Sequence, residues 1–192
     1  MNQNVQTGRT IDVEAATTAV RDLLRALGED PEATHLRETP RRVAGAFEEM
    51  LSSRPFDLTT FPNDEGYDEL VVVRDITFSS LCEHHLLPFV GVAHVAYLPK
   101  DHILGLSKLA RVVERHSRRL QVQERMTHQI AEWLQTELSP RGVGVVVEAE
   151  HMCMRLRGAK SAGTTTITSS LRGTIRNDAR TRSEFLALAQ RR

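Results

Sequence analysis

The sequence has few of the features that mark a special architecture. It contains only two cysteines, Cys82 and Cys153, too few for a disulfide framework, and its longest apolar runs, such as residues 143–147, are far too short to cross a bilayer. The segment 1–10 is polar and lacks the basic and apolar regions of a secretory signal, so we expect a cytoplasmic protein without a membrane span. In a reducing cytoplasm, two cysteines accompanied by histidines favour metal binding or catalysis over a disulfide.

Net charge and aromatic residues are also scarce. The 25 Lys and Arg residues balance the 25 Asp and Glu residues, and only 5% of the residues are aromatic. Because a neutral chain has no overall positive field, we expect no nucleic-acid partner and no binding to a membrane surface, and an anionic ligand needs a local cluster of cations. The rest of the composition, 40% hydrophobic and 26% charged, is typical of a globular protein.

Hydrophobic periodicity divides the 192 residues into a helical beginning and a mixed remainder. Helices are predicted over 12–28 and 39–51, so residues 1–65 are expected to form an N-terminal helical extension and residues 66–192 the principal domain. In that domain the pattern predicts strands over 70–73, 90–98, 143–157 and 164–170, helices over 106–120 and 122–138, and a last helix opened by a capping box of Thr181 and Glu184. Strands separated by a helical pair predict an α+β fold built on an antiparallel sheet.

Two short motifs contain residue types that bind metals. Cys82 and His85 are three residues apart, a spacing at which one turn offers a thiol and an imidazole to a single ion. Alternation along the expected strand 143–157 would place a second set of polar groups on one face: His151, Cys153, Arg155 and Arg157. Such a face does not have the composition of a core, which strengthens the interpretation as a metal site.

The number of ligands decides what such a site does. Both cysteines and one histidine would leave the fourth tetrahedral position of a zinc ion to water, and this is the catalytic arrangement. A closed site, with His84 or His151 as the fourth ligand, would be structural. The spacing does not distinguish these two arrangements.

A second group of residues could hold an anion. Ser107 lies at an expected helix start, and Lys108 and Arg111 share one helical face, so the helix N-terminus is flanked by two cations. The other interpretation is an ordinary solvated basic face. Glu124 is likewise either a surface carboxylate or a group that accepts hydrogen bonds from a guanine edge, and nothing local separates these readings.

Four motifs, taken together, resemble the GTP cyclohydrolase I family. They stand in the family order: Ser80-Leu81-Cys82-Glu83-His84-His85, Gly105-Leu106-Ser107-Lys108, Gln121-Val122-Gln123-Glu124-Arg125, and Glu150-His151-Met152-Cys153-Met154-Arg155-Leu156-Arg157-Gly158. The resemblance runs from about residue 71 to 186 and touches 38–42. It implies the tunnelling fold, an antiparallel sheet with two helices on one side, and a homodecamer with active sites between subunits.

The resemblance also implies roles for single residues. Zn²⁺ would be held by Cys82, His85 and Cys153, with His84 and His151 as acid and base groups. Glu124 would bind the guanine of GTP. The triphosphate would be held by Lys108, Arg111, Arg157 and Arg42, and Ser107 would help to place it. The implied reaction converts GTP and water to formate and 7,8-dihydroneopterin triphosphate, which enters tetrahydrofolate and pterin synthesis.

Two rival functions fit some of the same residues. One is a non-catalytic module with a closed, structural zinc site and a nucleotide-binding surface. The other is a different enzyme on the same fold that acts on a pterin or deazapurine. The complete zinc set and the cluster of Lys108, Arg111 and Arg157 favour a triphosphate substrate over the second rival.

Overall fold

The computed structural model describes residues 10–190, which form two compact units that divide between Ser53 and Arg54. The first unit consists of α1 (Val13–Ala26) and α2 (Thr39–Leu51), which pack against each other. Asp12 caps α1 by accepting a hydrogen bond from the backbone N–H of Ala15 at 2.8 Å. Gly28 follows the helix with a φ of +87°, a conformation that glycine adopts without strain. The two helices predicted here are confirmed.

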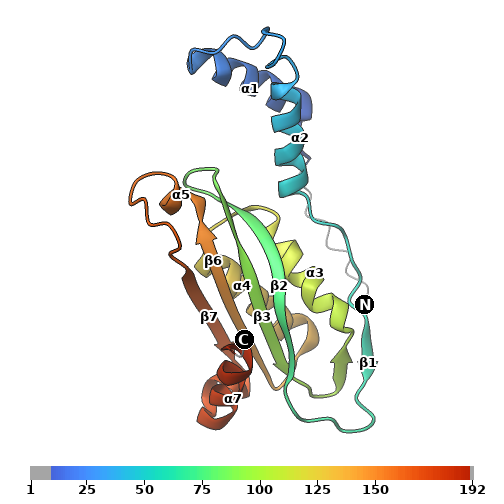
Figure 1. Ribbon diagram of the computed structural model, residues 1–192. Coiled ribbons are helices and arrows are strands. Elements are labelled where there is room, and N and C mark those ends of the chain that lie inside the picture. Colours follow the sequence, from blue (N-terminus) through green and yellow to red (C-terminus); the bar gives the residue numbers. More distant parts are fainter. Residues whose placement is uncertain (1–9, 191–192) are drawn as a thin grey trace. The chain divides into compact units, whose positions relative to one another are not determined.

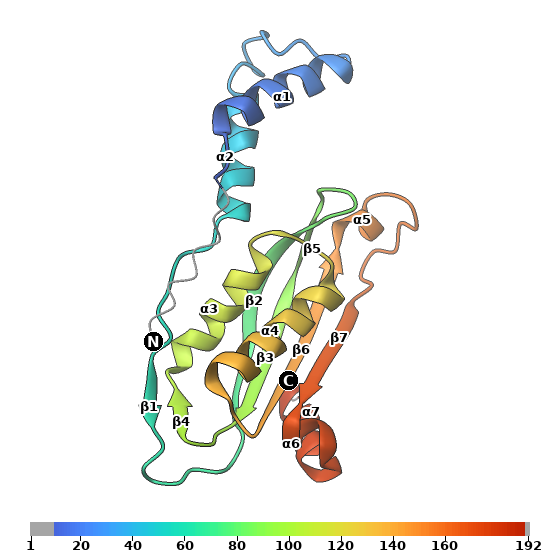
Figure 2. The ribbon, with the colours of Figure 1, turned by 180° about the vertical axis from the view of Figure 1, so that it is seen from behind.

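The second unit is built on a five-stranded sheet in the order β5-β2-β3-β6-β7; Figure 1 shows the four long strands and Figure 2 shows β5. Its strands are β2 (Val71–Cys82), β3 (Pro88–Leu98), β5 (Leu120–Gln121), β6 (Gly142–His151) and β7 (Thr166–Arg172). The four long strands are antiparallel, whereas the short β5 runs parallel to the end of β2. A separate ribbon pairs β1 (Thr60–Pro62) with β4 (His102–Leu104).

Two helices cover one face of this sheet, α3 (Leu106–Ser117) and α4 (Gln123–Leu138) (Figure 2). Leu109, Met126 and Ile130 are fully buried from this side against strand residues such as Phe89 and Val145. The short α6 (Gly173–Asn177) and the C-terminal α7 (Ala179–Gln190) pack on the opposite face through a smaller apolar cluster. The expected α+β fold, an antiparallel sheet with two helices on one side, is confirmed.

Close approach of β3 and β6 depends on a glycine in the middle strand. Gly91 lies opposite Ala149, and a Cβ at this position would fall 1.9 Å from the carbonyl oxygen of Glu148. No side chain fits in that space, so the strand pair that leads to the candidate site requires glycine here.

Two local expectations are wrong. The strand expected over 143–157 ends at His151 and is followed by α5 (Met152–Arg155). Its last pair with β3 joins His151 to Phe89, at the end where β3 begins, so the chain beyond has no strand to pair with and forms a helical turn. The last helix is capped by Asp178, whose carboxylate accepts from the N–H of Thr181 at 2.8 Å, and not by the expected capping box.

Residues 54–62, which follow the first unit, belong with the sheet by their contacts. Phe56 and Leu58 pack against the main core, and β1 pairs with β4. The division into an extension, 1–65, and a catalytic domain, 66–192, stays a prediction. Among residues 10–190, no helix is long and apolar enough to cross a membrane.

Candidate metal centre

A tight turn between β2 and β3 brings Cys82 and His85 together. The carbonyl oxygen of Cys82 accepts hydrogen bonds from the N–H groups of His85, at 3.3 Å, and Leu86, at 2.9 Å, and the N–H of Cys82 donates to Leu87 at 2.9 Å. Leu86 has a φ of +56°, which is uncommon for a residue with a side chain and reverses the chain direction here. The turn therefore places a thiol and an imidazole three residues apart on the same side.

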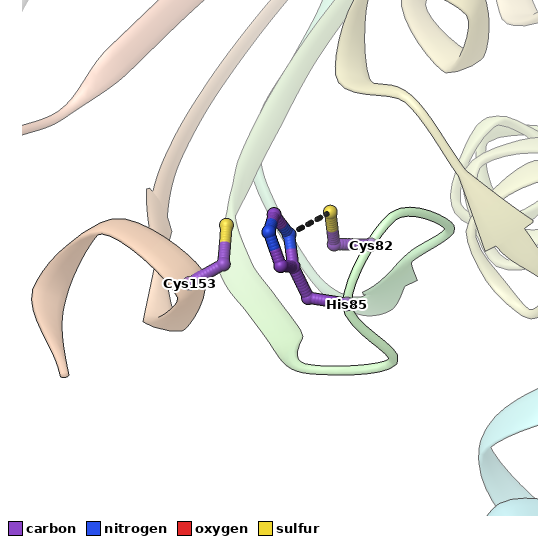
Figure 3. Close-up of side chains that lie close together, drawn as sticks. All are labelled: Cys82, His85 and Cys153. Atoms are coloured by element: carbon purple, nitrogen blue, oxygen red, sulfur yellow. Dashed lines mark hydrogen bonds between the residues drawn. The ribbon is translucent and has the colours of Figure 1, made fainter. Parts of the chain in front are cut away.

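Cys153 approaches the same point from α5, which follows β6. The ligand atoms of Cys82, His85 and Cys153 all lie within 4.8 Å of one another, and Figure 3 shows the three side chains converging. Cys82 is buried, Cys153 half-buried and His85 exposed, so the group is open to solvent on the histidine side. Among the described residues, this is the group of His, Cys, Asp or Glu side chains that could hold a metal ion.

The donor set and its spacing fit a zinc ion. Zn–S and Zn–N bonds of about 2.3 and 2.0 Å at a tetrahedral centre put sulfur and nitrogen ligands about 3.5 Å apart, and Cys82 Sγ lies 3.7 Å from His85 Nδ1. Burial and the adjacent Cys82 raise the pKa of the Cys153 thiol. A bound cation would reverse this effect, because metal binding favours the thiolate.

His151 stands beside this group in a rigid setting. Its ring stacks on Phe89 with centroids 4.6 Å apart and planes 3° from parallel, and its Nε2 lies 2.7 Å from Oε1 of Gln123. Burial lowers the pKa of His151, while the carboxylate of Glu124 acts in the opposite direction. His151 therefore has a fixed ring plane and an acidic neighbour from the start of α4.

The hydrogen bonds of Gln123 determine which nitrogen of His151 carries the proton. The amide Nε2 of Gln123 donates to the carbonyl oxygens of Val147, at 3.1 Å, and Thr166, at 3.0 Å, and lies 3.2 Å from the hydroxyl of Thr168. Carbonyl oxygens only accept, so the amide nitrogen must face them and Oε1 must face His151. Nε2 of His151 then donates to Oε1, which leaves Nδ1 to exchange a proton with a ligand.

The remaining predicted residues are not all near the metal group. His84 lies next to it, with Nδ1 at 3.8 Å from Cys82 Sγ and its side chain 63% exposed. Glu124 is exposed at the start of α4, close enough to His151 to influence its pKa. Arg157 lies exposed in the chain after α5, and Arg42 is part of α2 in the other unit.

Three predicted phosphate ligands lie on α3, whose N-terminal end is far from the metal group. Ser107 and Lys108 are at the start of this 12-residue helix, next to β4. The other end of the helix precedes β5, which pairs with β2 at Cys82. At 1.5 Å per residue the helix is about 18 Å long. Arg111 donates to Glu114 at 2.9 Å and lines a pocket of about 380 Å³ against the edge of β2, residues 75–79. Within one chain, Ser107 and Lys108 do not adjoin the metal group.

Sequence reasoning missed Gln123 and Phe89, which hold His151. It also gave no role to Glu83 and Arg125, which form an ion pair at the turn 82–87 between β2 and β3, called the metal loop below. The one available signal is a glutamine on the apolar face of α4, where it is 1% exposed. A polar residue in a buried position needs partners, and its position alone does not identify them.

Comparison with known proteins adds independent information. The family model described as GTP cyclohydrolase I matches residues 16–190. A protein named GTP cyclohydrolase 1 from Synechococcus sp. (strain JA-3-3Ab) is 56% identical over 178 residues, which cover 91% of this chain and 78% of that protein. A protein of the same name from Aquifex aeolicus (strain VF5) is 53% identical over 180 residues, covering 94% and 98%. By this family match over most of its length, the chain belongs to the GTP cyclohydrolase I family.

Proposed function

We propose that the protein is a zinc-dependent GTP cyclohydrolase I that converts GTP and water to formate and 7,8-dihydroneopterin triphosphate. The observation that carries the proposal is the convergence of Cys82, His85 and Cys153 next to His151, in a chain of this family. Three protein ligands leave a position for a reactant, which a closed structural site lacks. The product would enter tetrahydrofolate and pterin synthesis.

When bound, zinc supplies the Lewis acidity that makes water a nucleophile near neutral pH. Nδ1 of His151, whose Nε2–H is already donated to Gln123, takes a proton from the attacking water and delivers it to N7 as the oxygen adds at C8. The exposed His84 assists proton transfer in the second hydrolysis, which releases formate. The ribose then rearranges and the pteridine ring closes.

Substrate binding uses the charged residues around these groups. The carboxylate of Glu124 accepts hydrogen bonds from N1–H and the amino group of guanine, which sets the purine beside His151. Lys108, Arg111, Arg157 and Arg42 hold the triphosphate, and Ser107 helps to place it. These groups match the charge of a nucleoside triphosphate, although a single chain places two of them a helix length from the metal ligands.

A shared site in a homodecamer accounts for this separation. A second copy can bring Ser107 and Lys108 to the metal group of the first, and the sheet has edges at which copies can join. In the part of the chain that the structure describes, β7 is paired on one side only, and β2 is paired with β5 only at Leu81 and Cys82. Unpaired edges of this kind join sheets of neighbouring subunits.

The test is to incubate metal-analysed protein with GTP and to measure released formate together with the absorbance of the dihydropterin, with Cys153→Ser as control. Formate and chromophore that appear together, and are absent with the variant, support the proposal. Protein that contains zinc and binds GTP without changing it would contradict it and favour a binding module.

Mixing variants tests the shared site. Lys108→Ala and His151→Ala should each be inactive as pure proteins. After unfolding and joint refolding, about a quarter of the sites would combine an intact Lys108 from one copy with an intact His151 from another, and activity should return to that extent. No recovery in mixed oligomers would contradict a site shared between copies.

A further inference from the structure

Glu83, in the turn between the metal ligands Cys82 and His85, is tied to the segment 120–125 at two points. Its backbone N–H donates to the carbonyl oxygen of Gln121 at 3.1 Å. Its carboxylate binds both terminal nitrogens of Arg125, with Nη1 at 3.3 Å from Oε1 and Nη2 bonded to Oε2. Main chain and side chain therefore hold the metal loop to the same short segment.

Arg125 is itself held in place by further hydrogen bonds. Its Nε donates to Oε1 of Gln121 at 3.0 Å and its Nη2 to the carbonyl oxygen of Leu120 at 3.3 Å. Gln121 is 1% exposed, and its amide donates to the carbonyl oxygen of His116 at 2.8 Å and to Gln129 at 2.9 Å. Exposed ion pairs contribute little partly because two mobile side chains must be ordered. Here the guanidinium of Arg125 is already ordered, so Glu83 forms a bidentate ion pair with a fixed partner.

The anchored segment also carries Gln123 and Glu124, which set His151 and face the proposed guanine position. We propose that Glu83 and Arg125 are positioning residues that hold the metal loop in a fixed position against the start of α4, so that zinc affinity depends on this ion pair. The inference rests on the proposed function only in assuming that zinc is the metal. Neither residue is a ligand: Arg125 acts through Glu83, and Glu83 acts through the turn on Cys82 and His85.

Charge alone predicts a different outcome, which makes the inference testable. A cation near a metal site repels the ion and an anion attracts it, so through the field alone Arg125→Met would tighten zinc binding and Glu83→Gln would weaken it. If the pair positions the loop, both substitutions weaken binding. The double variant should then be no weaker than the weaker single variant, because each change removes the same interaction.

The measurement is the zinc dissociation constant of the full-length protein, from competition with a chromophoric chelator at fixed pH and salt. We expect Glu83→Gln and Arg125→Met each to weaken binding about tenfold, as is typical for groups that orient metal ligands. Arg125→Lys should lie between them and the unchanged protein, because lysine can pair with Glu83 but cannot also reach Gln121 and Leu120. The matched control is Arg25→Met, which removes an exposed pair with Asp22 at 2.9 Å on α1 and should leave zinc affinity unchanged.

Three results would overturn the inference: tighter binding by Arg125→Met, additive losses in the double variant, or unchanged affinity with a lower urea midpoint of the metal-free protein. The last result would mean that the pair serves only stability. Because the titration contains no GTP, it can be read even if the unchanged protein releases no formate from GTP. Failure of the proposed GTP cyclohydrolase function is thereby distinguished from failure of the inference on the Glu83–Arg125 pair.

Discussion

Replacement of Gln123 by leucine tests the internal support of His151. The side chain is 1% exposed and joins α4 to β6, β7 and His151 through contacts of 3.1, 3.0, 3.2 and 2.7 Å. The amide nitrogen carries two hydrogens, so its three contacts amount to two hydrogen bonds. Leucine has a similar volume, so the change removes three hydrogen bonds, including the one to His151, without creating a large cavity. At about 1 kcal/mol of net stability for each bond, the expected loss in the free energy of unfolding is about 3 kcal/mol.

Urea unfolding at a fixed protein concentration measures this loss. With an m value of about 2 kcal/mol/M, the midpoint should fall by about 1.5 M. Gln135→Leu is the control on the same helix, because Gln135 makes one hydrogen bond, to Pro140 at 3.1 Å, and should shift the midpoint by a few tenths molar. The two glutamines thus differ in the number of bonds removed.

Gln123→Glu tests the orientation of the amide. A carboxylate can still accept from His151, but it offers no N–H to Val147 or Thr166, and its charge would face two carbonyl oxygens. We expect this variant to be at least as unstable as the leucine variant at neutral pH. Near-normal midpoints for both variants would refute the assigned network, and with it the proton position on His151.

The remaining predictions concern the metal, the strand crossing and a buried histidine. Cys153→Ser should weaken zinc binding by more than about a hundredfold, measured by chelator competition, because a thiolate ligand is lost. Gly91→Ala should prevent folding, judged by the circular dichroism of the expressed protein, since a Cβ would lie 1.9 Å from the oxygen of Glu148; a folded variant would contradict the register of β3 and β6. Burial lowers the pKa of His116 from 6.5 to about 3, so the unfolded chain takes up a proton first and stability should fall as the pH drops below 6.5. Between pH 7 and pH 5 this histidine should lower the free energy of unfolding by about 2 kcal/mol. Urea unfolding at the two pH values measures the loss, and His116→Leu should lack it.

Predictions from the sequence succeeded where local chemistry decides the structure. Asp12 and Gly28 mark the ends of α1 through caps that depend only on neighbouring residues, and the three-residue spacing of Cys82 and His85 is a property of one turn. The helices α3 and α4 follow from apolar periodicity. Each of these features involves residues close together in the chain, so their patterns are visible without a fold.

The features that sequence reasoning missed depend on contacts between distant segments. β6 ends at His151 because β3 begins opposite it, and no pattern in 143–157 indicates where the partner strand stops. Gln123 and Arg125 stand in a recognised motif, yet their partners come from β6, β7 and the metal loop. Strand alternation does not explain how Cys153 reaches Cys82 and His85, because β6 ends at His151 and Cys153 lies in α5.

The residues that could hold a metal come from both neighbours of β3, and this has a thermodynamic consequence. Cys82 ends β2 and His85 follows it, whereas Cys153 follows β6, so a zinc ion would cross-link two segments that the unfolded chain keeps far apart. Binding to the folded form alone stabilises it by about 2.7 kcal/mol when free zinc is a hundred times its dissociation constant. Folding and metal supply are then coupled, and zinc depletion should open the junction of β6 and α5 before the rest of the sheet. The amount of folded protein in a cell would accordingly follow the free zinc concentration.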